Sequence, residues 1–239
     1  MIFPDPLIAA RFVRREKRFF IHAETDDGTP LVAHTNNTGR MTGCLFPGAR
    51  IWLSPAANPA RKLKFSLEIV ETPAGVPVGV NTSLANTLVA EAVTDGLLPE
   101  LSDYTELQRE VRYGTRNSRV DLLLSGGRQQ VWLEVKNVSL VTGQHGRFPD
   151  APTARGRKHL LELQDVVQSG QRAALAFCSQ RPDARSVGPA DDIDAEYGHL
   201  LREVASAGVE VYGLGCQVTP SGIRVDRRLQ VDLRQQVDL

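Results

Sequence analysis

The sequence predicts an α/β protein made of two parts, a small β domain over residues 1–78 and an α/β domain with a mixed central sheet over residues 79–239. Short runs of β-forming residues, separated by turn residues, fill the first part. Residues 73–77 then combine proline and glycine, which is typical of a break between structural units. After this break helical and strand-like patterns alternate, and such alternation indicates an α/β fold.

The first part contains four β-like runs, with turn residues such as Asp27 and Gly28 between them. An open five-stranded barrel of the oligonucleotide-binding (OB) type suits the size of this part and its basic first strand, and the pattern fits other small β folds as well. Residues 73–77 are expected to form a linker to the second part. The four runs span residues 19–23, 31–34, 50–53 and 64–70.

The second part shows longer periodic segments. Gly96, Gly170 and Gly208 fall where helices should end. In the tail over residues 223–239, apolar and polar residues alternate at first and polar residues then predominate. We expect this tail to add an edge strand or to fray. We predict helices at residues 83–97, 155–169 and 194–207, and strands at 107–113, 119–125, 130–136, 172–178 and 209–214.

Composition limits the classes of partner. The 28 basic and 28 acidic residues cancel, so the whole-chain charge gives no support for a nucleic-acid partner and any basic surface must be local. No apolar run approaches the roughly 20 residues that cross a bilayer, and the basic start does not suit a signal peptide. We therefore expect a cytoplasmic protein with no membrane partner. The three cysteines lack a C-x-x-C spacing and are expected to be free thiols.

The central prediction concerns a hairpin formed by residues 119–125 and 130–136, joined by a four-residue loop. Its register places Asp121 directly opposite Glu134. A shift by one residue would turn the apolar sets of the two strands to opposite faces, so the hydrophobic pattern itself favours this register. One face consists of Val120, Leu122 and Leu124 with Val135, Leu133 and Val131, and the other of Arg119, Asp121 and Leu123 with Lys136, Glu134 and Trp132.

Two carboxylates across a hairpin lie about 5 Å apart at their Cβ atoms, close enough to share a hard divalent cation such as Mg²⁺ or Mn²⁺. Lys136 projects from the same face and can orient a water or offset charge on a phosphate. Asp121, Glu134 and Lys136 are therefore the candidate catalytic residues for metal-assisted phosphodiester hydrolysis. A purely structural alternative is a salt-bridge network of these residues with Arg119 on an exposed face. The helices expected on both sides of the sheet argue against it, because buried charges without a function are costly.

A third carboxylate is expected from the first helix. Glu91 follows Leu84 by seven residues and Leu88 by three, so it shares their apolar stripe and should face the sheet. It is the candidate third metal ligand. A glutamate at the edge of the stripe that reaches water fits the pattern equally well, and Glu110 in the next strand is a weaker candidate for the same role.

Basic residues cluster near the start of the chain, around residues 112–119 and at the start of the helix near residue 155. Exposed N–H groups at a helix start, together with nearby arginines, offer a seat for phosphate. His159 is a weaker candidate, because a lone histidine beside an apolar stripe more often packs. A solvated charged face is the alternative for each cluster. The candidate nucleic-acid-binding residues are Arg14, Arg15, Lys17, Arg18, Arg112, Arg116, Arg119, Arg155, Arg157 and Lys158.

Several separate motifs occur in the order Asn37–Met41, Gly43 with Cys44, Val80–Thr82, Ser118–Asp121, Trp132–Leu140, Phe148–Ala151 with Thr153, Arg155 with Gly156, and Lys158–Leu160. In these motifs the chain resembles the sugar fermentation stimulation protein A family of bacteria and archaea. The resemblance implies an N-terminal OB barrel and a C-terminal domain of the PD-(D/E)XK, or restriction-endonuclease-like, superfamily. It also implies DNA binding and a regulatory link to sugar use. By this resemblance Asp121 and Glu134 are metal ligands, Lys136 is the catalytic lysine and Glu91 is the helix acid.

The chain departs from the family pattern at Thr35 and Asn36, where Cys-Pro is usual, and at Ala154, where an acid is frequent. Neither departure touches the predicted metal site. They leave open the detailed surface of the barrel and of the basic helix start.

The sequence thus predicts a DNA-binding protein with a nuclease-like site that hydrolyses phosphodiester bonds with Mg²⁺ or Mn²⁺. The alternative is a non-catalytic, sequence-nonspecific DNA-binding regulatory factor linked to sugar metabolism. A module that binds small molecules or proteins is a third hypothesis, which the neutral charge favours. The sequence leaves open whether RNA is bound and whether the protein is a dimer.

Overall fold

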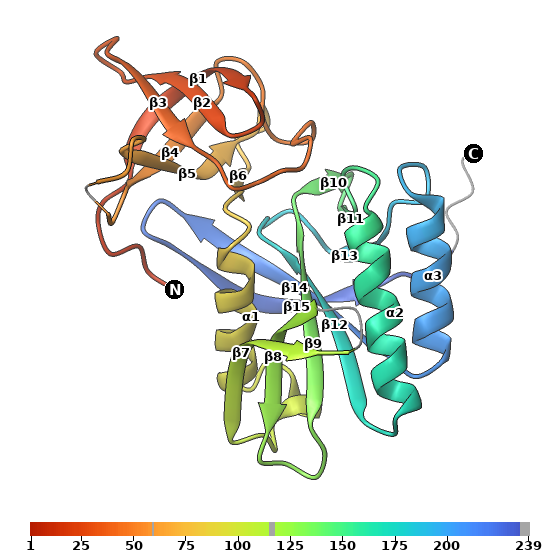
Figure 1. Ribbon diagram of the computed structural model, residues 1–239. Helices are drawn as coiled ribbons and strands as arrows, with labels where there is room; N and C mark the ends of the chain where they lie inside the picture. The colour runs from red at the N-terminus through yellow and green to blue at the C-terminus, as the bar shows by residue number, and fades with distance from the viewer. Residues whose placement is uncertain (59, 115–117, 235–239) are drawn as a thin grey trace.

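The structure is a computed structural model that describes residues 1–58, 60–114 and 118–234. A small β domain sits above an α/β domain, and the chain crosses between them at residues 80–82 (Figure 1). In the described ranges we find no helix that is long and apolar enough to span a bilayer.

The β domain consists of β1 (Ile8–Glu16), β2 (Phe20–Glu24), β3 (Pro30–His34), β4 (Arg50–Pro55), β5 (Phe65–Glu71) and β6 (Pro77–Gly79). Along β1, Ala10 and Phe12 are buried while Arg11 and Val13 are exposed, because successive side chains of a strand point to opposite faces. The sheet order is β3-β2-β1-β4-β5-β6, and a parallel pairing of β3 with β5 closes it. The OB-type barrel is confirmed, and it is closed rather than open.

Residues 73–76 form a turn and Pro77 begins β6, so this segment is not the linker that its composition predicts. The amide of Thr72 donates to the carbonyl of Val76 at 2.9 Å, and Gly75 adopts a φ of 74°. The chain therefore folds back, and β6 pairs antiparallel with β5. A cluster of proline and glycine indicates that the chain changes direction, but it does not show whether a strand follows. The pairing of β6 with β5 makes this segment a turn within the barrel.

The α/β domain contains β7 (Glu106–Tyr113), β8 (Ser118–Ser125), β9 (Val131–Val138), β10 (Leu140–Thr142), β11 (His145–Phe148), β12 (Arg172–Ser179), β13 (Ser186–Pro189), β14 (Glu210–Thr219) and β15 (Gly222–Val231), with the helices α1 (Leu84–Thr94), α2 (Ala154–Gln168) and α3 (Ala195–Ser206) and the 3-10 turn η1 (Pro99–Leu101). The strands form one mixed sheet in the order β10-β11-β13-β15-β14-β12-β9-β8-β7. Every helix and strand predicted for this domain is present, and β10, β11 and β13 occur in addition.

The central strand β12 shows how the two faces of the sheet are covered. Ala174 and Ala176 pack in the core beneath α1, while Leu175 and Phe177 pack beneath α2 and α3. A strand that is buried on both faces is an almost continuous apolar run, as β12 is in the sequence. Helix α1 lies on one face of the sheet, and α2 and α3 lie side by side on the other (Figure 1).

The tail does not form an edge strand. Strand β15 lies inside the sheet between β14 and β13, antiparallel to the first and parallel to the second. Its buried residues, Ile223 and Leu229, join the two cores on opposite faces. The expectation of an edge or frayed segment is therefore wrong for residues up to 231, and residues 235–239 lie outside the described ranges.

The first three residues cross from the barrel to the α/β domain. Ile2 bridges to Gly222, and the amide of Phe3 donates to the carbonyl of Ser221 at 3.1 Å. The Phe3 side chain is buried in the core beneath α1. The start of the predicted β domain thus packs on the second domain.

Candidate active site

The predicted hairpin register is confirmed. Leu122 pairs with Leu133 and Leu124 with Val131 in the antiparallel ladder of β8 and β9. The loop between the strands runs over residues 126–130, one residue longer than predicted. This register brings Asp121 and Glu134 to the same end of the paired segment, next to Leu122 and Leu133.

The ladder stops at Leu122, and Asp121 turns its carboxylate toward neighbouring elements. The amide of Val135 donates to Oδ2 of Asp121 at 2.7 Å, and the side chain of Asn86 in α1 donates to Oδ1 at 2.8 Å. The interruption also breaks the alternation along β8. Val120 packs with Tyr113 rather than with Leu122, so its predicted place in the apolar layer is wrong.

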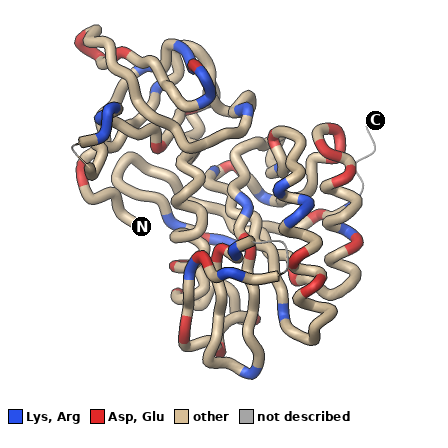
Figure 2. Tube along the Cα trace, in the orientation of Figure 1, with Lys and Arg blue, Asp and Glu red and all other residues tan. Residues whose placement is uncertain are grey.

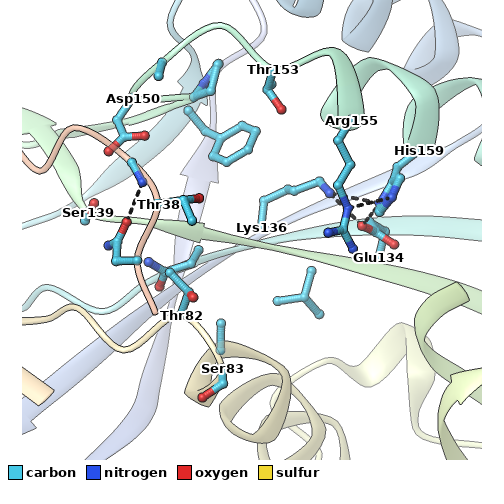
Figure 3. Close-up of a pocket in the computed structure, with 18 of the residues that line it drawn as sticks. Thr38, Thr82, Ser83, Glu134, Lys136, Ser139, Asp150, Thr153, Arg155 and His159 are labelled. Atoms are coloured by element: carbon cyan, nitrogen blue, oxygen red, sulfur yellow. Dashed lines mark hydrogen bonds and ion pairs between the residues drawn. The ribbon is translucent and has the colours of Figure 1, made fainter. Parts of the chain in front are cut away.

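Glu134 faces α2 and is 1% exposed, whereas the Asp121 carboxylate lies against β9 and α1, so the two acids do not share one face of the hairpin as predicted. Nζ of Lys136 donates to its Oε1 at 2.6 Å, and Nδ1 of His159 contacts the same oxygen (Figure 3). Nε of Arg155 donates to Nε2 of His159 at 3.4 Å, which leaves Nδ1 as the donor to Glu134. His159 is therefore part of the site, although its sequence context favours a packing role.

The start of α2 holds this group in place. Thr153 is the N-cap residue, and its hydroxyl accepts from the amide of Gly156 at 3.0 Å. The first turn then presents Arg155 to the site, and His159 follows one turn later on the same face because residues four apart in a helix are neighbours.

The two acids have opposite electrostatic environments. Burial, and after it the nearby charge of Glu134, together raise the pKa of Asp121 to about 6. Burial alone would also raise the pKa of Glu134, but Lys136 and His159 outweigh it and hold this pKa at about 2. Glu134 is thus ionised far below neutral pH, whereas Asp121 loses its proton only as the pH approaches neutrality.

The acids open into a cavity of about 480 Å³ between the two domains. One wall comes from the barrel loop with Thr38 and Gly39, and the others come from the starts of α1 and α2 (Figure 3). The polar residues in its lining are Arg18, Asn37, Thr38, Thr82, Ser83, Asn86, Asp121, Glu134, Lys136, Asn137, Ser139, Arg147, Asp150, Thr153, Arg155 and His159.

The donor set suits a hard divalent cation. Oε2 of Glu134 is buried and has no hydrogen-bond partner among the described residues. An orphaned carboxylate oxygen beside a second carboxylate is the oxygen-rich environment that Mg²⁺, Mn²⁺ and Ca²⁺ prefer. Within the described ranges, no three His, Cys, Asp or Glu side chains lie close enough to hold a metal together. Asp121 and Glu134 would therefore share the cation with backbone or water oxygens.

Glu91 is not part of this cavity, which corrects its assignment as the third metal ligand. Its carboxylate pairs with the amino group of Met1 at 2.7 Å and is 41% exposed. Its exposure fits the alternative of a glutamate at the edge of the apolar stripe, and α1 contributes Asn86 to the cavity instead. Glu110 is exposed and lines a neighbouring cavity rather than this one.

The predicted basic residues divide into two groups. Arg18 and Arg155 line the central cavity, whereas Arg112, Arg119 and Lys158 line a second cavity that adjoins it at Arg155 and His159. The salt-bridge alternative is realised in part, since Lys136 pairs with Glu134.

The remaining basic candidates lie elsewhere. Arg14 pairs with Glu16, and Arg157 pairs with Asp194 and Glu196 at the start of α3, so neither is brought to the site. Lys17 is exposed in the turn after β1. Arg15 lines a third cavity with Arg18, and Arg116 lies outside the described residues.

Both domains match models of one protein family. The model described as the SfsA N-terminal OB domain covers residues 13–80, and the model described as the sugar fermentation stimulation protein RE domain covers residues 83–222. A sugar fermentation stimulation protein homolog from Thioalkalivibrio sulfidiphilus is 48% identical over 98% of both chains. The homolog from Geobacter metallireducens is 47% identical over 98% of this chain and 100% of its own.

A solved structure of SfsA from Pyrococcus furiosus in complex with Ca²⁺ is similar over the whole fold. It is 30% identical, has a TM-score of 0.88, and the match covers 97% of this chain and 98% of that chain. Since these matches span both domains in the order found here, the chain belongs to the sugar fermentation stimulation protein family.

Proposed function

We propose that this protein hydrolyses phosphodiester bonds in DNA with a divalent cation, Mg²⁺ or Mn²⁺, held by Asp121 and Glu134. The observation that carries the proposal is the orphaned Oε2 of Glu134, buried beside Asp121 at the base of a cavity with cationic side chains around it. Ca²⁺ binding by the relative from Pyrococcus furiosus supports a divalent cation in this family.

Each residue of the site has a distinct role in the proposed reaction. When bound, the cation would polarise a phosphoryl oxygen and make a coordinated water more acidic. Lys136 lies beside Glu134 and would donate to a phosphate oxygen as negative charge builds on it. His159 holds the Glu134 carboxylate in place from α2, and Arg155 extends the positive charge toward the rest of the phosphate backbone.

The decisive experiment compares cleavage by the wild type with that by Asp121→Ala and Glu134→Ala. We expect the wild type with Mn²⁺ to nick plasmid or cut single-stranded DNA, and both variants to lose cleavage while they retain DNA binding. Glu91→Gln is the matched control, because it neutralises an acid that lies outside the cavity. Cleavage by Asp121→Ala at the wild-type rate would refute the proposed site.

A second candidate is a DNA-binding regulator without catalysis. It is favoured by the contacts that Lys136 and His159 both make with one oxygen of Glu134. These contacts provide that carboxylate with hydrogen bonds and a compensating charge without a metal cation. Such a protein would bind DNA in the presence of a chelator, with an affinity that falls steeply with salt because phosphate contacts release counterions. Binding without cleavage under all metal conditions would select this function.

A further inference from the structure

Three adjoining cavities form a row that crosses the site. The central cavity shares Arg18, Thr38 and Gly39 with a cavity on the barrel, and it shares Arg155 and His159 with a cavity beside α2. We call this row of adjoining cavities the groove. It therefore runs from the barrel, past the two acids, to the outer side of α2.

The charges along the groove suit a polyanion that passes through it. The barrel cavity is lined by Arg15, Arg18 and Arg40 and contains no acid among its lining residues. At the opposite end, Arg112 and Arg119 lie with Arg155 and Lys158 against a single acid, Glu110. Figure 2 shows Lys and Arg residues on the barrel and at the start of α2. A chain of phosphates would thus meet cations on both sides of the acids.

The barrel loop forms a roof over the middle of the groove. The amide of Met41 donates to Oδ2 of Asp150 at 3.3 Å, and the guanidinium of Arg15 donates to the carbonyls of Gly39 and Asn37. Gly39 approaches Asp150 so closely that a Cβ atom at this position would collide with the carboxylate. The roof is therefore held against the α/β domain as well as against the barrel.

The barrel itself is bound firmly to its neighbour. The amide of Gly79 in β6 donates to the carbonyl of Gln180 in the α/β domain at 2.9 Å. Arg181 reaches across from the α/β domain to the carbonyl of Gly43 at 3.2 Å. With buried side chains on both sides of these contacts, the roof is expected to stay in place when a ligand enters.

The size of the groove then selects the ligand. A cavity of about 480 Å³ falls in the range of small-molecule pockets, about 300–1,000 Å³, which accommodates one or two nucleotides rather than a double helix. The acids lie at its base, with Glu134 only 1% exposed, so a phosphate must enter the cavity to reach them. On the basis of the proposed function, we infer that the groove takes a single unpaired strand of nucleic acid and excludes an intact duplex.

Binding of matched oligonucleotides tests this inference. Fluorescence anisotropy in a chelator would compare one labelled single strand of DNA with the blunt duplex of the same sequence at fixed salt. We expect the single strand to bind at least about tenfold more tightly, since it can place phosphates along both basic ends. Equal or tighter binding of the duplex would overturn the inference while leaving the proposed function intact. If neither binds, the nucleic-acid function itself fails, and the inference with it.

Charge variants at the two ends test whether one strand spans the groove. Arg40→Ala and Arg112→Ala should each weaken single-strand binding and lower the slope of log affinity against log salt by about 0.7, the value for one phosphate contact on a single strand. Arg228→Ala is the charge-matched control, because Arg228 pairs with Glu100 away from the groove. A loss at only one end, or an equal loss in the control, would contradict a strand that runs along the whole groove.

The roof supplies a further test. Asp150→Ala removes the acceptor that holds the Met41 amide, so the preference for the single strand should shrink while the melting temperature reports whether the variant is folded. A folded variant with an unchanged preference would show that the roof does not exclude the duplex.

Discussion

The two helices that wall the candidate site differ in charge. The start of α1 offers only neutral polar groups, with Ser83 and Asn86 in the cavity and no acidic residue in its first turn. The start of α2 offers Arg155 and His159, and Lys136 lies on the same side of the sheet. One acid of the pair faces each wall, since Asn86 donates to Asp121 and His159 contacts Glu134.

This difference assigns different tasks to two acids that look equivalent in the sequence. The cationic wall keeps Glu134 ionised, so this acid is ready to attract a divalent cation at neutral pH. The neutral wall offers no cation that would offset burial, so the pKa of Asp121 is raised. A bound cation would therefore stabilise the ionised form of this acid the most. The following predictions alter one wall or one acid at a time.

The largest effect is expected from Glu134→Gln in the metal-free protein. The change leaves Lys136 buried without its counter-ion, and breaking a buried pair costs about 3–5 kcal/mol. At about 2–4 °C per kcal/mol for a chain of this size, calorimetry should show a melting temperature at least about 6 °C lower. Asp121→Asn is the matched control, because it neutralises the acid on the neutral wall and should not lower the melting temperature. Equal losses in the two variants would mean that the walls do not differ.

The pH dependence of stability should identify Asp121 as the acid with the raised pKa. A raised pKa in the folded state means that its contribution to stability is present below the unfolded pKa near 3.8 and is lost as the pH rises through about 6. The stability of the wild type relative to Asp121→Asn should therefore fall by about 2 kcal/mol between pH 4 and 7, because each unit of pKa corresponds to about 1.4 kcal/mol and part of the titration lies outside this range. Urea unfolding in a chelator at several pH values measures this difference. A difference that is independent of pH would contradict the assignment.

The sequence predicts the central hairpin well because its information is local. Asp121 and Glu134 lie on two adjoining strands whose alternating apolar residues set the register. The pattern does not reveal that the ladder stops at Leu122, since this depends on the amide of Val135 finding the Asp121 carboxylate. The place of Val120 was therefore wrong although the register was right.

Long-range contacts account for what the sequence did not predict. Helical periodicity places Glu91 next to the apolar stripe of α1, but its side chain is partly exposed, and periodicity does not tell which turn of α1 lies beside the acids. The partner of Glu91, the amino group of Met1, is 90 residues away in the chain. Likewise, Met41 and Asp150 are separated by 109 residues, and no local sequence pattern indicates that the barrel loop covers the site.

Asn86→Asp changes the neutral wall into an acidic one and should have an intermediate effect. Asn86 already lies 2.8 Å from Asp121, so the variant would place a third carboxylate beside the proposed cation. We expect calorimetry with Ca²⁺ to show about tenfold tighter binding, since each added carboxylate ligand strengthens a calcium site. The metal-free variant should be less stable than the wild type because two like charges then adjoin. Unchanged Ca²⁺ affinity would place the cation away from α1.

The smallest effect is expected from Glu91→Gln, which tests the same helix two turns from its start. This change removes the charge that pairs with the Met1 amine in a partly exposed position, and such pairs contribute about 0–1 kcal/mol. Ca²⁺ affinity should stay at the wild-type value, in contrast to Asn86→Asp, because the carboxylate lies outside the cavity. A clear loss of Ca²⁺ affinity in Glu91→Gln would mean that α1 shifts along its axis when the cation binds. The neutral start of α1 would then line the cavity only in the metal-free protein.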